Sequence, residues 1–423
     1  MTQTLIVGAK VWDATGGPAF VGDVLVDGNR IAAVAKGTGT LAASDAQVID
    51  GAGLFLMPGM TEGHAHLSFE AVASTEDLIA TPPEEQVLGT ARTAKVLIDH
   101  GFTSAYGASA ARLRLDVAVR NEVNAGRLPG PRIRAGSIEL TVTGGMGDES
   151  RLHNIRSSPS ISIDGAEEMR KAVRLCIREG CDNIKLVTSG DPFYPQTPAT
   201  STPMSFEEVK MAVDTAHALG AKVNAHARSA QSVKNCVRAG VDGIFHAEFV
   251  DEEGMDMLEA AKDRVFVMPT VSLFPIMMNE AAAFGFPAEV GVAMGLPAVI
   301  EASARVHTEM RKRGIRHLIG GDYGFLWSRQ GTNARDLKFF VDLFGYSPEA
   351  ALVCATRNGG LAMRSEGDLG VLSDGALADM LLVDGDPTQD VTIMTDKDRL
   401  VMIMKDGQVH KNETHAVKRR AAA

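Results

Sequence analysis

Cysteine is scarce in this chain of 423 residues. The four cysteines are Cys176, Cys181, Cys236 and Cys354. They form no C-x-x-C pair and lack the density of a disulfide-stabilised domain, which disfavours both a thiolate metal site and a disulfide scaffold. We therefore predict reduced thiols and a cytoplasmic protein.

Long hydrophobic runs and an excess of positive charge are also missing. No stretch of eighteen consecutive apolar residues occurs, and the first residues lack the basic and then apolar pattern of a secretion signal. Lys and Arg number 42 against 53 Asp and Glu, a net charge of −11. This balance disfavours nucleic acid as a partner, and we expect a small molecule instead of nucleic acid or a membrane.

Both ends of the chain have the sequence pattern of β-strands joined by turns. Residues 1–58 contain short apolar runs separated by glycine- and aspartate-rich turns, and the same texture returns over residues 365–423. We predict that these two segments together form one small β-sandwich domain.

The middle of the chain, residues 59–364, alternates apolar runs with amphipathic helical patterns. Several helical patterns end on a glycine, as in residues 165–180 and 205–220. We count eight apolar runs, the last being residues 315–324. This alternation predicts an α/β fold of the (β/α)₈ TIM-barrel type, whose active sites lie at the carboxyl ends of the strands.

Two histidines lie at the end of the first predicted barrel strand. His64 and His66 are two residues apart, so their side chains project from the same face of a strand. Two ring nitrogens then converge as metal ligands. The alternative is a pair of histidines that are hydrogen bonded to neighbouring groups.

Lys185 lies within the apolar strand of residues 183–187. A buried ammonium group costs several kcal/mol, so this lysine needs either a nearby carboxylate or a modification. One modification is reaction with CO₂ to form a carbamate, an anion that can bridge two cations. Both interpretations remain open from the sequence.

Three further polar residues end predicted strands. His226 and His246 close the fifth and sixth strands, and Asp322 closes the eighth. Neutral imidazoles and oxygen anions suit Zn²⁺, and two such ions lower the pKa of a bridging water toward neutrality. We predict a binuclear zinc centre that supplies a metal-bound hydroxide, with Asp322 as general base and then acid.

The order of these residues resembles the amidohydrolase superfamily. The segments LIVGAKVWDATGG, MPGMTEGHAH and GVLSDGALADMLLVDGDP are also similar to it, especially to imidazolonepropionase-like proteins, Xaa-dipeptidases and ochratoxin- and phenylurea-type hydrolases. The resemblance implies that His64, His66 and Asp322 hold the more buried metal. It further implies that His226 and His246 hold the other, that a carboxylated Lys185 bridges the two, and that the chain forms homo-oligomers.

Two positions bear on substrate recognition. Met146 stands where dipeptidase-like members carry histidine, and His153 is either its substitute or a surface residue. Arg228 follows His226 by two residues and either binds a substrate carboxylate or forms an ion pair. The methionine-rich segment of residues 266–290 is longer than a typical loop, and we predict a lid there with an apolar inner wall.

The predicted activity is metal-dependent hydrolysis of a C–N bond. The favoured substrates are amide- or peptide-like: an N-acyl amino acid, a dipeptide or an ochratoxin-type amide. The alternatives are hydrolysis of an aryl urea, carbamate or cyclic amide, and deamination. A binding protein without chemistry is disfavoured, because every expected type of ligand residue is present.

Overall fold

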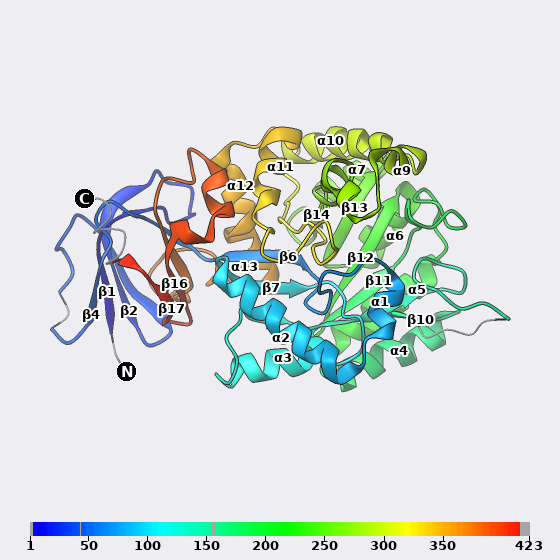
Figure 1. The fold of residues 1–423 in the computed structure, drawn as a ribbon, viewed down its shortest axis with the longest axis horizontal. Coiled ribbons are helices and arrows are strands. Elements are labelled where there is room, and N and C mark those ends of the chain that lie inside the picture. Colours follow the sequence, from blue (N-terminus) through cyan, green and yellow to red (C-terminus); the bar gives the residue numbers. More distant parts are fainter. Residues whose placement is uncertain (1–2, 43, 154–157, 365, 415–423) are drawn as a thin grey trace.

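The computed structural model describes residues 3–42, 44–153, 158–364 and 366–414. Strands from both ends of the chain lie together at one end of the molecule, and a larger α/β body forms the other end (Figure 1). The candidate site lies in the α/β body.

The terminal strands form one hydrogen-bonded sheet in the order β17-β16-β15-β5-β1-β2-β3, with β4 paired to β1. Strand β15 from the carboxyl-terminal part pairs antiparallel with β5 from the amino-terminal part, with Leu381 opposite Met57. Both ends of the chain thus contribute to one sheet, while the two-sheet sandwich and its boundaries stay predictions. The strands are β1 (Thr4–Val11), β2 (Phe20–Asp27), β3 (Arg30–Lys36), β4 (Gln47–Asp50), β5 (Phe55–Pro58), β15 (Met380–Val383), β16 (Leu400–Lys405) and β17 (Gln408–Asn412).

The α/β body contains two parallel sheets, in the orders β6-β7-β8 and β10-β9-β11-β12-β13-β14. Most residues of β6, β7, β11, β12 and β13 are buried, because helices cover the outer side of the sheets. This is a TIM-barrel-like α/β fold. The strands are β6 (Met60–Ala65), β7 (Phe102–Gly107), β8 (Arg132–Arg134), β9 (Gly136–Thr141), β10 (Ser160–Ser162), β11 (Asn183–Val187), β12 (Lys222–Ser229), β13 (Gly243–Phe249) and β14 (Phe266–Met268).

The eighth predicted barrel strand, residues 315–324, is not a regular strand in the structure. It makes a parallel bridge between His317 and Val267, and Leu318 N–H donates to the carbonyl of Val267 at 3.0 Å. On its other side Gly63 N–H donates to the carbonyl of Ile319 at 3.0 Å. The segment therefore lies between β14 and β6, but two glycines and the left-handed Asp322 end the extended conformation early.

The helices follow the strands, as the alternation predicts. Helix α5 begins with a capping box between Ser205 and Glu208, and α6 ends on the left-handed Gly240. The helices up to β14 are α1 (Thr75–Ala80), α2 (Pro83–Asp99), α3 (Leu115–Asn124), α4 (Ala166–Arg178), α5 (Phe206–Ala218), α6 (Ala230–Ala239) and α7 (Glu252–Ala260). Those after the residue 315–324 segment are α11 (Arg335–Phe344), α12 (Pro348–Ala355) and α13 (Arg357–Met363), followed by the 3₁₀ turns η2 (Val391–Thr395) and η3 (Lys397–Arg399).

The segment predicted as a lid is helical where a loop was expected. It comprises α8 (Leu273–Glu280), η1 (Ala281–Phe284) and α9 (Ala288–Ala293), and α10 (Leu296–Lys312) follows. Its Leu273 and Phe286 line the cavity described below. Among the described residues, no helix is long and apolar enough to cross a membrane.

Candidate metal centre

His64 and His66 lie at the carboxyl end of β6 and are almost fully buried. The Nδ1 atom of His66 lies 3.0 Å from the carbonyl of Ser109, and its Nε2 lies 3.0 Å from Oδ1 of Asp322. Both ring nitrogens of His64 are buried without a hydrogen-bond partner among the described residues. Buried imidazole nitrogens normally have a partner, and a divalent cation would suit the nitrogen of His64 that carries the lone pair. Ligand atoms of His64, His66 and Asp322 lie within 4.8 Å of one another.

His226 and His246 come from the neighbouring strands β12 and β13, where His246 is level with Ala227. Their ring centroids are 4.5 Å apart, and the His64 and His246 centroids are 5.6 Å apart. The Nε2 atom of His226 lies 3.0 Å from the carbonyl of Gly190. That carbonyl accepts the Nε2 proton, which leaves the Nδ1 lone pair for another partner.

Lys185 lies in the middle of β11 and is 2% exposed. Its Nζ lies 4.1 Å from the ring centroid of Phe245, and the ring of His64 stacks on the same phenyl ring at 3.9 Å. Its register partner on β9 is Glu139, which also lines the cavity. All six predicted side chains thus line one cavity.

Burial sets the protonation states in this cluster. It lowers the pKa of His64, His226 and His246 well below the ordinary value, which keeps these imidazoles neutral. Burial also lowers the pKa of Lys185, against the opposing charge of Glu139. A neutral imidazole is the form that binds metal, and a neutral amine is the form that reacts with CO₂.

Asp322 remains a carboxylate. Burial alone would raise its pKa, but electrostatic interactions with His64, His66 and Lys185 and the hydrogen bond with His66 outweigh burial and hold the pKa below the ordinary value. A permanently ionised oxygen beside neutral imidazoles is a typical donor set for a divalent cation.

Backbone strain is concentrated at this end of the strands. His246, Ala247, Thr270 and Asp322 all have positive φ angles, of 77°, 69°, 53° and 58°. Each such residue costs about 1–3 kcal/mol, and such strain persists where surrounding contacts impose it, often at functional sites.

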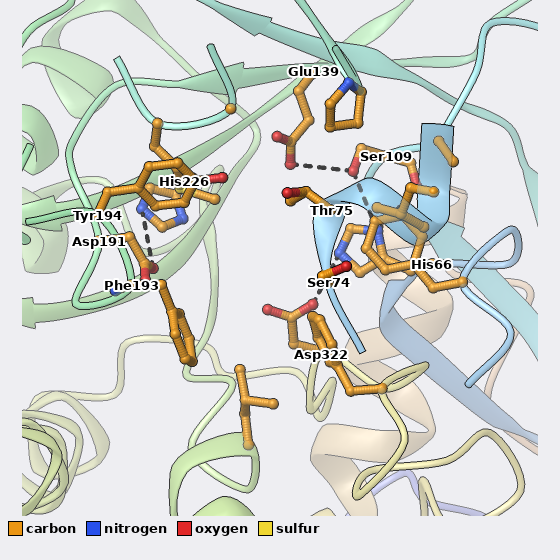
Figure 2. Close-up of a pocket in the computed structure, with 18 of the residues that line it drawn as sticks. His66, Ser74, Thr75, Ser109, Glu139, Asp191, Phe193, Tyr194, His226 and Asp322 are labelled. Carbon is orange, nitrogen blue, oxygen red and sulfur yellow. Dashed lines mark hydrogen bonds and ion pairs between the residues drawn. The ribbon is translucent and has the colours of Figure 1, made fainter. Parts of the chain in front are cut away.

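A cavity of about 450 Å³ opens above the cluster. In Figure 2, His66, Ser109 and Asp322 lie on one side and His226, Asp191, Phe193 and Tyr194 on the other. Aromatic rings form much of the wall, and Met146 also lines it. The aromatic lining residues besides the histidines are Phe69, Phe193, Tyr194, Phe286, Phe325 and Trp327.

Arg228 lines the cavity but is already engaged. Its Nε donates to Oδ2 of Asp191 at 2.8 Å, and its Nη1 donates to Glu248. All three side chains are buried, so the structure shows the ion-pair interpretation of this arginine. His153 is exposed and is not among the lining residues, in agreement with a surface position.

Sequence reasoning missed several residues at the site. Glu139 was recognisable as a lone carboxylate in the apolar strand β9, at the layer where the other site residues lie. Its Oε1 accepts a hydrogen bond from Ser109 at 3.3 Å. Glu149 and Tyr194, which are hydrogen bonded at 2.9 Å, come from loops that carry no such pattern.

Histidines and a carboxylate at the strand ends of a TIM-barrel-like fold, beneath a substrate-sized cavity, define a metal-dependent hydrolase. The profile of the Amidohydrolase family matches residues 55–410. The chain belongs to that family.

Individual relatives narrow the chemistry. Ochratoxinase from Aspergillus niger is 25% identical over 380 residues, which are 84% of this chain and 75% of that protein. A prolidase complexed with N-methylphosphonate-L-proline superposes with a TM-score of 0.87 at 27% identity, covering 97% of this chain and 100% of that one. A Xaa-Pro dipeptidase with bound methionine gives a TM-score of 0.86 at 25% identity and the same coverage. This chain is accordingly a metal-dependent hydrolase of amide-type bonds.

Proposed function

We propose that this enzyme hydrolyses an amide or peptide-like bond next to a bulky apolar group. The observation that carries the proposal is the convergence of four histidines, a lysine and an aspartate beneath an aromatic-walled cavity. N-acyl amino acids, dipeptides and ochratoxin-type amides are the substrate classes that fit such a cavity and the named relatives.

The donor set fits two divalent ions, which we take to be Zn²⁺. His64, His66 and Asp322 hold one ion, and His226 and His246 hold the other. The unpartnered nitrogens of His64 support this assignment, because a cation would satisfy the one that carries the lone pair. Lys185 would supply the shared anion as a carbamate, and the lowered pKa of this amine favours the reaction with CO₂.

Asp322 moves the proton. A divalent cation held by these residues would polarise the substrate carbonyl and acidify the attacking water. The Asp322 carboxylate accepts the proton of that water and returns it to the leaving amine as the C–N bond breaks. Nε2 of His66 lies 3.0 Å from Oδ1 of Asp322, so the two side chains are close enough to ligate the same ion.

The cavity walls hold the apolar part of the substrate. Phe325 and Phe286 both pack on Trp327 and line the cavity, as do Phe193 and Tyr194. Met146 lines the cavity and has no proton to donate to the substrate carbonyl, so a metal ion would have to polarise that carbonyl. Two carboxylates already pair with the guanidinium of Arg228 and balance its charge. Arg228 therefore attracts a substrate carboxylate only weakly.

A panel of substrates tests the bond that is cleaved. N-acyl amino acids, dipeptides, anilides, aryl ureas, carbamates and lactams are assayed by amine release, with protein from which a chelator has removed metal as the control. We expect turnover of amides with aromatic acyl or amino groups, and none after chelation. Exclusive turnover of ureas, carbamates or lactams, or release of ammonia alone, would assign the alternative chemistry.

The domain organisation, the oligomeric state and the location of the protein also follow from the sequence as proposals. We propose a catalytic barrel of residues 59–364 and a β-sandwich of residues 1–58 and 365–423, supported by the sheet that both ends share. We also propose a cytoplasmic homo-oligomer, supported by the exposed apolar side chains Val290 and Val292 on α9. A particle of 44.8 kDa in light scattering would contradict the oligomer.

A further inference from the structure

Thr270 adopts a conformation that threonine rarely takes. It follows β14 with a φ angle of 53°, in the left-handed region where a β-branched side chain is an outlier. The residue is 3% exposed. Strain at a buried β-branched residue persists only when its side chain has contacts that require it.

Those contacts are two hydrogen bonds of one hydroxyl group. Oγ1 of Thr270 lies 2.7 Å from the carbonyl of its own neighbour Pro269, and it is also hydrogen bonded to Nδ1 of His246. The Pro269 oxygen can only accept, so the single hydroxyl proton goes to it. The hydroxyl oxygen then accepts, and the proton it accepts is that of His246 Nδ1–H.

This chain of hydrogen bonds decides which nitrogen of His246 is free. With the proton on Nδ1, the Nε2 lone pair is available on the cavity side, where the His226 ring lies 4.5 Å away between centroids. If the hydroxyl instead donated to Nδ1, the ring would carry its proton on Nε2 and would have no lone pair for a cation.

We propose that Thr270 is a positioning residue that fixes the tautomer and orientation of His246 for metal binding. This inference rests on the proposed function, since it assigns a role within the same metal centre. Backbone carbonyls orient His66 and His226, whereas a side chain, that of Thr270, orients His246. A substitution of Thr270 can therefore remove the hydrogen bond that orients His246.

Two variants separate the hydroxyl from the shape of the side chain. Thr270→Val keeps the β-branched form and removes both hydrogen bonds, and Thr270→Ser keeps the hydroxyl. Thr90→Val is the matched control, because Thr90 is a buried threonine in α2 whose hydroxyl donates to the Gln86 carbonyl at 2.8 Å.

The measurement is titration of metal-free protein with Zn²⁺ in competition with a chromophoric chelator. We expect Thr270→Val to weaken one of two binding steps by about 10–100-fold, as removal of a hydrogen-bond partner of a ligand typically does. Thr270→Ser and Thr90→Val should bind like the wild type. Unchanged binding by Thr270→Val, or equal loss in Thr270→Ser, would overturn the inference.

A second readout uses the unaltered protein and does not depend on the folding of any variant. Long-range ¹H–¹⁵N correlation of histidine in the metal-free protein, with His246 assigned through His246→Gln, should show the proton on Nδ1. A proton on Nε2 would overturn the role of Thr270. A wild type that binds no divalent metal would instead contradict the proposed function, while the tautomer still tests Thr270.

Discussion

At the scale of single residues, Lys185 separates the binuclear proposal from a simpler metal site. Replacing it with alanine removes the carbamate, so the His226 and His246 side chains lose the anion they share with the other ligands. We expect Lys185→Ala to lose one of two metal ions and at least about 100-fold in activity, while remaining folded. Metal analysis and amine-release assays check this, and short carboxylates such as acetate should restore part of the turnover. Full activity with full metal content would return Lys185 to a structural role.

Asp322 is expected to matter for proton transfer more than for folding. Asp322→Asn keeps the shape of the side chain but cannot accept the proton, so kcat should fall by about 10²–10⁴-fold. The comparison is steady-state kinetics of metal-loaded protein beside the thermal unfolding midpoint of both proteins. A variant within about threefold of wild-type kcat would exclude the general-base role.

The sequence was enough to select the six proposed site residues. It was not enough to predict the groups to which the site residues are hydrogen bonded. Alternation along β6 and the strand-end positions of His226 and His246 follow from local periodicity. Contacts of the Arg228 guanidinium and the hydroxyl of Thr270 depend on loops that are far away in the chain. Local patterns do not determine such contacts.

At the scale of elements, the link between α5 and the start of β13 makes stability depend on pH. His217 near the end of α5 is hydrogen bonded through Nε2 to Oδ2 of Asp242 at 2.8 Å. This hydrogen bond raises the pKa of His217 in the folded protein. The stabilisation is therefore fully present below about pH 6.5 and is lost as the pH rises through the folded-state pKa.

The variant His217→Gln tests this sign. We expect the wild type to be more stable than the variant at pH 5.5, by less than about 1 kcal/mol because the pair is partly exposed, and the difference to shrink at pH 8.5. Denaturant unfolding at the two pH values measures it. A difference that grows with pH would contradict the assignment.

Elements also show where local patterns stop being informative. The run of residues 315–324 has the composition of a strand, but Gly320, Gly321 and the left-handed Asp322 turn the backbone toward the site. The expected lid loop contains α8 and α9 instead, because its alanines and methionines favour helix once its apolar side packs on the cavity rim. In the first case the tertiary structure overrides the local preference, whereas in the second the local preference for helix agrees with the structure and the prediction of a loop was wrong.

At the scale of the whole molecule, a partly buried ion cluster joins the terminal sheet to the α/β body. Arg132 on β8 pairs with Asp406 and lies 3.4 Å from Asp379, which is 1% exposed. Removing the arginine leaves a buried carboxylate without its cation, so Arg132→Ala should lower the free energy of unfolding by about 3–5 kcal/mol.

The double variant Arg132→Ala/Asp379→Asn provides the control. Neutralising Asp379 removes the unpaired charge, so we expect the double variant to regain part of the lost stability in denaturant unfolding. A loss below about 1 kcal/mol in Arg132→Ala, or no recovery in the double variant, would show that the two parts of the molecule are held together by other contacts.

The use of both chain ends in one sheet was predictable from their shared texture, since each end has short apolar runs and tight turns. The boundaries at residues 58 and 365 remain predictions. The cavity was harder to predict from the sequence. Its volume depends on how Phe193, Phe286 and Trp327, which come from separate loops, pack around it.

Metal content tests the central claim most directly. Protein purified without chelator is analysed for transition metals, and amine release from an aromatic amide is measured on the same sample before and after chelation. The account predicts close to two equivalents of a divalent metal per chain, and activity that disappears with the metal and returns when it is added back. Less than about one equivalent of any transition metal, or amide hydrolysis that survives complete removal of metal, would contradict it.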